Sequence, residues 1–269
     1  MNLQLHLAEK GVIVARRTDN LEAYDNFLRG WAYGWSLTKD GNVKARQLFQ
    51  KAVKLDPSYA DAYSSLGWIY FWGWVHQWSG DPNDLDRALQ LEHQAIALDD
   101  SLSLAHAFLG RMLVYKRQYD QAVAQGERAI DLAPNFAFAY FWLGQTLSRS
   151  GRPAEAIGLM QKTERFDPRN RELYESEVGI SEVLMGRYEE AIPILKKNLT
   201  VYPDNLWGHG WLAVAFVELG RKEEAQAEAA EVMRISPDFS LKVERQRWPL
   251  KDQTMSERYF ADWHKAGLK

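Results

Sequence analysis

Residues 137–168 read AFAYFWLGQTLSRSGRPAEAIGLMQKTERFDP, and this stretch contains two helical patterns separated by a turn. The first pattern marks one helix face at the spacing i, i+3, i+4 and i+7, with Tyr140, Leu143, Gly144 and Leu147. The glycine and proline of Gly151-Arg152-Pro153 then break the chain. A second stripe follows and ends before Pro168; it consists of Ala156, Met160 and Thr163. We therefore expect a pair of helices joined by a short turn.

The same pattern recurs along the chain, with an alanine placed twelve residues before a proline. These pairs are Ala45 and Pro57, Ala122 and Pro134, Ala156 and Pro168, Ala191 and Pro203, and Ala225 and Pro237; Ala88 stands twelve residues before Asp100 instead. The repeat is 34 residues long between Asp100, Pro134 and Pro168. A helix pair of this size cannot bury its apolar face alone, so stacked pairs are expected. The predicted repeats are 24–57, 60–100, 103–134, 137–168, 172–203 and 206–237.

Two motifs resemble the tetratricopeptide-repeat family. They are Tyr63-x-x-Leu66-Gly67-x-x-Tyr70 for the first helix of a repeat and Ala122, Ala129 and Pro134 for the second. The resemblance implies an all-α fold, a right-handed α-solenoid of about six helix pairs with a C-terminal capping helix. It divides the chain into an N-terminal capping or linker segment (1–21), the repeats (22–237) and a C-terminal capping segment (238–269).

Small residues occupy the eighth position of several repeats, as Gly67, Gly110, Gly144 and Gly179. We expect them to let the two helices of a pair approach closely, because a bulky residue there would force strained packing. In the capping segment, Tyr259, Phe260 and Trp263 lie on one side of a predicted helix that ends at Gly267. These rings are expected to cover the last apolar face of the array.

The second repeat is longer than the others by nine residues, since 43 residues separate Pro57 from Asp100. The additional residues lie around Phe71–Trp78, a stretch that contains three of the chain's eleven tryptophans. We interpret them as a lengthened first helix followed by a longer turn. Asp81 and Pro82 predict the start of the next helix, with aspartate as the N-cap and proline at the first helical position.

Composition and motifs argue against catalysis, so we expect no enzyme and no cofactor. The 269 residues include no cysteine, which excludes disulfides and thiolate nucleophiles, and the net charge of −3 with no basic face disfavours nucleic acid as a partner. The six histidines show no metal-ligand spacing. There is no strained nucleophile turn and no glycine-rich phosphate loop.

The resemblance also implies where a partner binds, because the first helices line the concave groove in this family. The groove residues carried over to this sequence are Trp68, Phe71, Trp72, Phe108, Arg111, Tyr115, Phe138, Phe141, Trp142, Gln145, Arg149, Trp207 and Trp211. An aromatic groove with a few polar groups is typical of a surface that binds a protein or peptide. The alternative is that the rings only pack against one another. Arg111 and Arg149 could each hold a carboxylate.

Some members of the family bind the C-terminal carboxylate of chaperone tails through paired lysine and asparagine residues. The corresponding positions hold Ser64, Trp68, Leu104 and Phe108. We therefore do not expect a chaperone-tail partner.

A narrower resemblance lies at both ends of the array. Residues 20–30, NLEAYDNFLRG, and the tail with Trp248-Pro249-Leu250-Lys251-Asp252 are similar to the C-terminal repeat region of bacterial multidomain proteins. Those proteins carry an adenylate cyclase or winged-helix regulator upstream, often with a TolB-like segment. This implies an alternative function as a ligand-sensing regulatory domain, with a small apolar or aromatic molecule near Trp68, Trp72 and Trp78.

Self-assembly into a homo-oligomer is a third alternative, through the groove or the end repeats. No apolar run reaches the length of about 18 residues that a membrane span needs, so membrane insertion is not expected. A free-standing protein would be cytoplasmic, whereas a fragment that follows an upstream transmembrane helix would be periplasmic.

Overall fold

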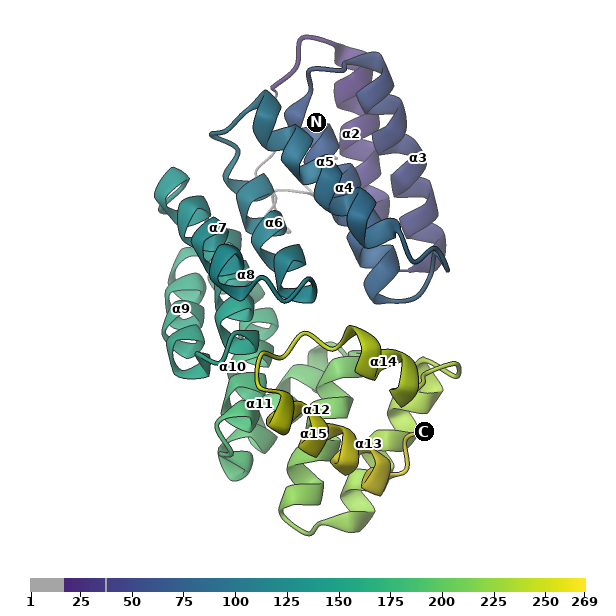
Figure 1. Cartoon of the computed structure of the whole chain (residues 1–269), viewed down its shortest axis with the longest axis vertical. Coiled ribbons are helices and arrows are strands. Elements are labelled where there is room, and N and C mark those ends of the chain that lie inside the picture. The colour runs from purple at the N-terminus through teal and green to yellow at the C-terminus, as the bar shows by residue number, and fades with distance from the viewer. Residues whose placement is uncertain (1–16, 37) are drawn as a thin grey trace. The chain divides into compact units, whose positions relative to one another are not determined.

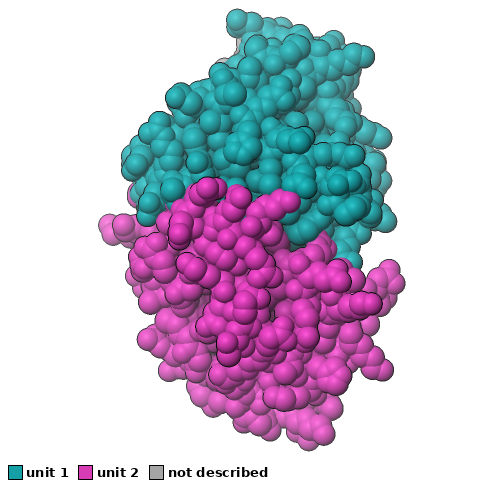
Figure 2. All heavy atoms as spheres, in the orientation of Figure 1, with its two compact units in different colours: residues 1–113, 124–142 teal, residues 114–123, 143–269 magenta. Residues whose placement is uncertain are grey.

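The computed structural model describes residues 17–36 and 38–269, and all regular structure in these residues is helical. The predicted all-α class is thus confirmed for this part of the chain. Most of the predicted N-terminal segment (1–21) lies outside the described residues. The chain divides into two compact units (Figure 2). Unit 1 contains the described residues up to Leu113 together with Ala124–Trp142, and unit 2 contains Val114–Val123 and Leu143–Lys269.

Unit 1 is built from helix pairs with short connections (Figure 1). Its complete helices are α2 (Leu21–Gly34), α3 (Lys39–Leu55), α4 (Ala60–Val75) and α5 (Asp84–Leu98). It also contains most of α6 (Ser103–Tyr115), the later part of α7 (Tyr119–Leu132) and the beginning of α8 (Ala137–Arg149). In each of the pairs α2–α3 and α4–α5 the two helices pack along each other.

Unit 2 continues the same arrangement and ends with two further helices. After the remainder of α8 it contains α9 (Pro153–Phe166), the 3-10 turn η1 (Pro168–Asn170), α10 (Arg171–Leu184), α11 (Tyr188–Val201), α12 (Leu206–Glu218), α13 (Lys222–Ile235), α14 (Leu241–Arg247) and α15 (Gln253–Ala266). The pairs α10–α11 and α12–α13 pack along each other, and α15 packs on α12 and α13. We refer to α2, α4, α6, α8, α10 and α12 as the first helices.

Local sequence explains where the helices begin. The side chains of Asn20, Thr38, Asn205 and Asp252 each accept a hydrogen bond from the backbone N–H three residues later, at 2.9–3.1 Å. These bonds satisfy N–H groups that the first helical turn leaves without partners.

Left-handed backbone marks the turn inside five of the pairs, and after α4 Gln77 adopts it with a φ of 57°. Gly151, Gly186 and Gly220 have φ values of 87°, 75° and 72°, conformations that glycine adopts without steric cost. Arg117 occupies the equivalent turn, between α6 and α7, with a φ of 59°. Arg117 therefore adopts the same left-handed conformation as the glycines of three other turns, although it carries a Cβ.

The predicted role of the small residues agrees with the packing inside the pairs. A Cβ on Gly67 would lie 3.1 Å from the backbone oxygen of Ala88, and one on Gly179 would lie 2.7 Å from Leu195 Cγ. A Cβ on Gly144 would overlap Met160 Cε. The helices in α4–α5, α8–α9 and α10–α11 thus approach closely at these glycines.

The additional residues of the second repeat extend one helix and one connection. Helix α4 has 16 residues and eight residues follow it before α5, whereas three residues separate α10 from α11. The predicted start of α5 at Asp81 is wrong, because Asn83 is the N-cap and Asp84 is the first helical residue. The Asp81 carboxylate accepts from the Asn83 N–H at 2.9 Å and pairs with Arg87 at 2.6 Å, which turns the chain once more before the helix begins.

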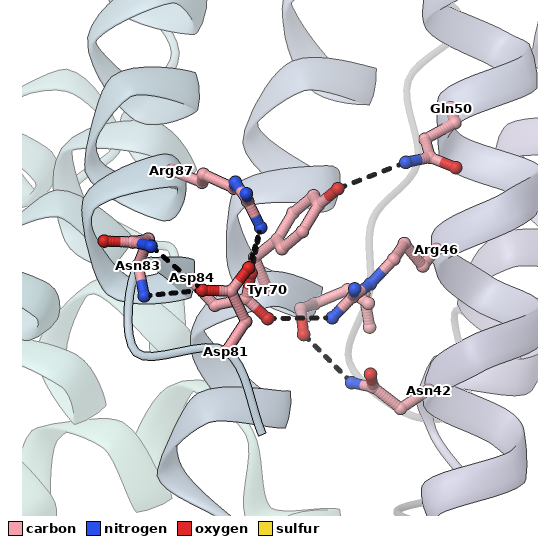
Figure 3. A network of polar contacts seen from close by, with 9 residues as sticks. Asn42, Arg46, Gln50, Tyr70, Asp81, Asn83, Asp84 and Arg87 are labelled. Atoms are coloured by element: carbon pink, nitrogen blue, oxygen red, sulfur yellow. Dashed lines mark hydrogen bonds and ion pairs between the residues drawn. The ribbon is translucent and has the colours of Figure 1, made fainter. Parts of the chain in front are cut away.

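A polar network fixes this connection against the preceding pair (Figure 3). The side chain of Asp84 is fully buried and accepts from Arg46 of α3 at 3.2 Å and from Arg87 at 2.9 Å. The Arg46 guanidinium also stacks over the ring of Tyr70, 4.1 Å from its centroid. Because Asp84 at the start of α5 pairs with Arg46 of α3, the end of the long connection is attached to α3.

Candidate partner-binding surfaces

The first helices of unit 1 bring a cluster of aromatic rings together. Trp68, at the centre of α4, stacks on Phe108 of α6 with ring centroids 4.3 Å apart and planes 16° apart. Its centroid lies 4.7 Å from that of Trp142 in α8 and 5.3 Å from that of Trp72, one turn later in α4. Aromatic pairs at these separations stabilise each other beyond the area they bury.

The cluster continues from α8 to α2. Phe141 lies 4.7 Å from Trp142 and 6.4 Å from Phe138, measured between ring centroids. Phe138 in turn meets Trp35, the C-cap residue of α2, edge-on at 5.9 Å, and Trp35 lies 5.8 Å from Trp31. We call these rings, from α2, α4, α6 and the start of α8, the aromatic cluster of unit 1.

Burial separates the predicted groove residues of unit 1 into two classes. All but one are buried, at 8% exposure or less: Trp68, Phe71, Phe108, Arg111, Phe138, Phe141 and Trp142. Trp72 is half-buried, as are two residues that the sequence reasoning did not select, Trp35 and His76. The sequence does contain a signal for the contribution of α2: Trp31 and Trp35 are four residues apart, which places them on the same face of a helix.

The open end of the cluster lies at the long connection after α4. The His76 ring lies 4.4 Å from Trp72 and stacks on Trp78 at 4.7 Å, centroid to centroid. Its Nδ1 is 3.0 Å from the Trp72 carbonyl oxygen. Trp72 and Trp78 are both half-buried, so one edge of this aromatic stack faces solvent.

Several polar atoms in the cluster are buried without a bond. The indole Nε1 atoms of Trp31, Trp35, Trp72 and Trp142 are inaccessible and have no hydrogen-bond acceptor among the described residues. A buried donor left unsatisfied costs about 1–3 kcal/mol. The cluster is therefore largely apolar, but it contains four indole N–H groups without a hydrogen-bond acceptor among the described residues.

The predicted groove residues at the ends of α6 and α8 belong to unit 2 and are less buried. Tyr115, Gln145 and Arg149 are all half-buried. Arg149 forms an ion pair with Glu177 of α10, whose side chain is only 1% exposed. The carboxylate that Arg149 holds in this structure is thus supplied by the chain itself.

The remaining two groove residues, Trp207 and Trp211 of α12, lie beneath the C-terminal segment. Trp248 lies 5.4 Å from Trp207 and 5.7 Å from Trp211, and Tyr259 meets Trp211 edge-on at 5.2 Å, between ring centroids. Trp211 is only 2% exposed, whereas Trp207 is half-buried. These rings form a second aromatic cluster, confined to unit 2.

Two histidines occupy equivalent positions in their pairs, and neither has a free ring nitrogen. His106 Nδ1 lies 2.6 Å from Gln125 Oε1 and its Nε2 lies 3.1 Å from the Asp100 carbonyl oxygen. His209 makes the corresponding contacts with Glu228 and the Pro203 carbonyl, at 2.6 and 3.0 Å. No group of side chains with metal-binding geometry occurs among residues 17–36 and 38–269.

None of the helices in the described part of the chain combines the length and the apolarity that a bilayer crossing requires.

Comparisons with known proteins agree with this architecture. Two family models described as tetratricopeptide repeat match residues 109–171 and 183–241. No curated protein shows significant sequence similarity to the chain.

Three solved structures with similar folds share at most 20% of the sequence. The Cut9–Hcn1 hetero-tetramer of the APC/C gives a TM-score of 0.64 at 16% identity, over 96% of this chain and 45% of that chain. A thermophilic TPR protein of Thermus thermophilus gives 0.55 at 20% identity, over 76% and 98% of the two chains. Pseudomonas aeruginosa pilF gives 0.54 at 19%, over 82% and 96%. The chain thus spans less than half the length of its Cut9–Hcn1 match.

These matches are too distant in sequence to indicate more than the fold. They agree with the architecture of successive helix pairs. Proteins with this repeat are generally non-catalytic scaffolds for protein–protein interaction. The predicted α-solenoid fold of helix pairs is confirmed, and the sequence matches the tetratricopeptide repeat over residues 109–171 and 183–241.

Proposed function

We propose that the chain is a non-catalytic interaction module that binds an extended or helical segment of a partner protein at the aromatic cluster of unit 1. The observation that carries the proposal is the aromatic cluster contributed by neighbouring first helices, which reaches solvent at the half-buried rings of Trp35 and Trp72.

A bound peptide segment offers apolar side chains to such a surface. Apolar side chains of the segment would contact the half-buried rings of Trp35 and Trp72. Tryptophans of this kind are enriched among the residues that dominate binding energy in interfaces.

The proposal is tested by selecting a displayed library of random peptides on the immobilised chain. Trp72→Ala is expected to weaken the selected peptides at least tenfold, because Trp72 is part of the cluster and half-buried, so its loss disturbs folding less than loss of a buried ring. Trp74→Ala is the matched control: this residue is also a half-buried tryptophan of α4, two positions later and hence on the opposite helix face.

Binding is measured by fluorescence polarisation of labelled peptides, and circular dichroism verifies that both variants fold. If the library yields no binder, or if Trp74→Ala weakens the peptides as much as Trp72→Ala does, the proposed surface is wrong.

A second candidate function is the sensing of a small aromatic molecule, and the stack of Trp72, His76 and Trp78 favours it. A planar ligand would extend this stack at its exposed edge and bias an upstream cyclase or transcription domain, as the narrower sequence resemblance implies. Melting shifts against a panel of aromatic metabolites distinguish the two functions, because this candidate requires a shift that Trp78→Ala removes. Self-assembly is separated from both by light scattering across a range of protein concentrations.

A further inference from the structure

The C-terminal segment of unit 2 lies on the first helices, the side that binds partners in the proposed function of unit 1. Helix α15 packs on α12, where the Trp263 indole donates to the Gly210 carbonyl oxygen at 2.7 Å (Figure 1). The Arg258 Nε donates to Glu218 Oε1, at the end of α12, at 2.6 Å. Tyr259, Phe260 and Trp263 are almost completely buried, at 1% exposure or less.

The contacts of this segment extend beyond the last helix pair. The Tyr259 hydroxyl donates to the Val183 carbonyl oxygen in α10, at 3.1 Å. Before α15 begins, the Lys251 N–H donates to the Arg149 carbonyl oxygen at the end of α8, at 2.9 Å. A cap needs to cover only the final pair of a repeat array. This segment instead contacts all three first helices of unit 2.

We propose that the first-helix surface of unit 2 is a helix-binding surface and that α15 is its built-in occupant. The ligand class follows from what α15 presents: an amphipathic helix with an arginine, two adjacent aromatic residues and a tryptophan three positions further, as in Arg258, Tyr259, Phe260 and Trp263. An external partner helix with this pattern would compete with α15 for the surface. The inference stands independently of the proposed function of unit 1.

The geometry accounts for both affinity and selectivity. The surface supplies backbone carbonyl oxygens at Gly210 and Val183, which accept from the polar ends of otherwise buried aromatic side chains of the occupant. Glu218 supplies a carboxylate for the arginine. Helix recognition of this kind uses anchors one turn apart on one face, which is the spacing of Tyr259 and Trp263.

The connection to the array explains why α15 holds the surface against competitors. Seventeen residues, 236–252, which include the short helix α14, separate α13 from α15. A short link gives the attached helix an effective concentration on the order of millimolar, so a peptide with equal contacts competes poorly. An external helix binds the chain well only when α15 is loosened or when the helix makes better contacts than α15.

The test uses the full chain and a labelled peptide with the sequence of residues 252–269, added in trans and followed by fluorescence polarisation. Arg258→Glu in the chain replaces the cation beside Glu218 by a third carboxylate, since Asp262 of α15 already contacts Glu218, and it loosens α15 while the peptide keeps its arginine. We expect this variant to bind the peptide at least tenfold more tightly than the original chain does. His264→Ala, an exposed substitution in the same helix, is the matched control and should behave like the original chain.

A charge exchange then identifies the surface. In the double variant Glu218→Arg with Arg258→Glu, the internal pair is restored and binding of the peptide should fall back by the same factor. The Glu218→Arg single variant should prefer a peptide that carries Arg258→Glu. Equal binding of both peptides by all variants would overturn the assignment.

Release of the C-terminal segment from the surface is measured separately, by the reactivity of an introduced cysteine. The chain has no cysteine of its own, so a single introduced thiol gives the whole signal. A Leu250→Cys thiol, at a position 3% exposed, should react slowly with a thiol reagent and faster after Arg258→Glu; Val43→Cys, at a position 48% exposed, gives the rate of an open site. Trp263→Ala serves as a second loosening variant. If neither loosening variant gains affinity for the peptide, the surface does not accept a helix in trans and the proposal is refuted.

Discussion

The imidazole Nδ1 of His209 lies 2.6 Å from Glu228 Oε2, and its Nε2 lies 3.0 Å from the Pro203 carbonyl oxygen, so both ring nitrogens face acceptors. Burial lowers the pKa of His209, but the hydrogen bonds to Glu228 and Pro203 and the Glu228 charge outweigh it, and the net pKa is raised above 6.5. The contact between His209 and Glu228 joins α12 to α13, and it is stronger when the imidazole is protonated.

This raised pKa predicts a stability that depends on pH. The contribution of a group whose folded pKa is raised is complete below the unfolded value, here about 6.5, and is lost as pH rises through the folded value. We expect the melting temperature to fall between pH 6 and pH 9, and Glu228→Gln to reduce this fall because it removes the charge. Glu223→Gln on the exposed face of α13 is the control and should leave the pH profile unchanged. A profile of Glu228→Gln parallel to that of the original chain would contradict the assignment.

A second prediction concerns the buried ion pair between Arg149 and Glu177. Arg149→Ala leaves the Glu177 carboxylate buried without its counter-charge, and breaking a buried pair in this way costs about 3 kcal/mol or more. Arg152→Ala is the matched control, because its ion pair with Glu155 is exposed and such pairs contribute about 0–1 kcal/mol. Urea denaturation of both variants measures the two losses. Similar losses would show that burial does not set the strength of the Arg149 pair.

The turn between α6 and α7 gives a stabilising prediction. Arg117 adopts a left-handed conformation, with φ at 59°, where Gly151 and its equivalents stand in other repeats. This conformation costs a residue with a Cβ about 1–2 kcal/mol, whereas the cost of glycine is mainly chain entropy, about 0.5–1 kcal/mol. Arg117→Gly is thus expected to raise the free energy of unfolding by roughly 0.5–1 kcal/mol. Lys116→Gly, one residue earlier, should lower it; the opposite order would refute the strain argument.

The repeat glycines predict a graded response to added side chains. A Cβ on Gly179 meets the branched side chain of Leu195, which is fully buried, whereas a Cβ on Gly144 meets the terminal methyl of Met160. A methionine end can move, so Gly144→Ala is expected to cost less than Gly179→Ala, which should cost roughly 1–3 kcal/mol. Gly144→Leu exceeds what Met160 can accommodate and should lower the melting temperature markedly. Thermal melts of the three variants test this ranking.

The repeat architecture was accessible from sequence because its signals are local. Gly144, Ala156 and Pro168 act on their own helix or on the adjacent one, and their period locates the pairs. The start of α5 was predicted wrongly because Asp81 has an alternative to capping a helix: it pairs with Arg87 and the Asn83 N–H.

The candidate sites were less accessible, because which rings meet depends on long-range packing. Nothing local indicates that Trp35 of the first pair meets Phe138 of the fourth. The reach of the C-terminal segment is equally hidden, since the Lys251 N–H and the Arg149 carbonyl that meet there belong to the backbone and leave no side-chain signature. The burial of Tyr259, Phe260 and Trp263 could be predicted, because it follows from the pattern of one amphipathic helix. The structure agrees with this prediction.

The division into two units has a consequence for how the protein can be dissected. The chain passes from one unit to the other after Leu113, again after Val123 and a third time after Trp142, so neither unit is a continuous stretch of sequence. Residues 1–142 include all of unit 1 but also Val114–Val123 of unit 2, and residues 114–269 include all of unit 2 but also Ala124–Trp142 of unit 1. A fragment that contains one complete unit therefore carries a piece of the other, and no single cut separates the two units cleanly.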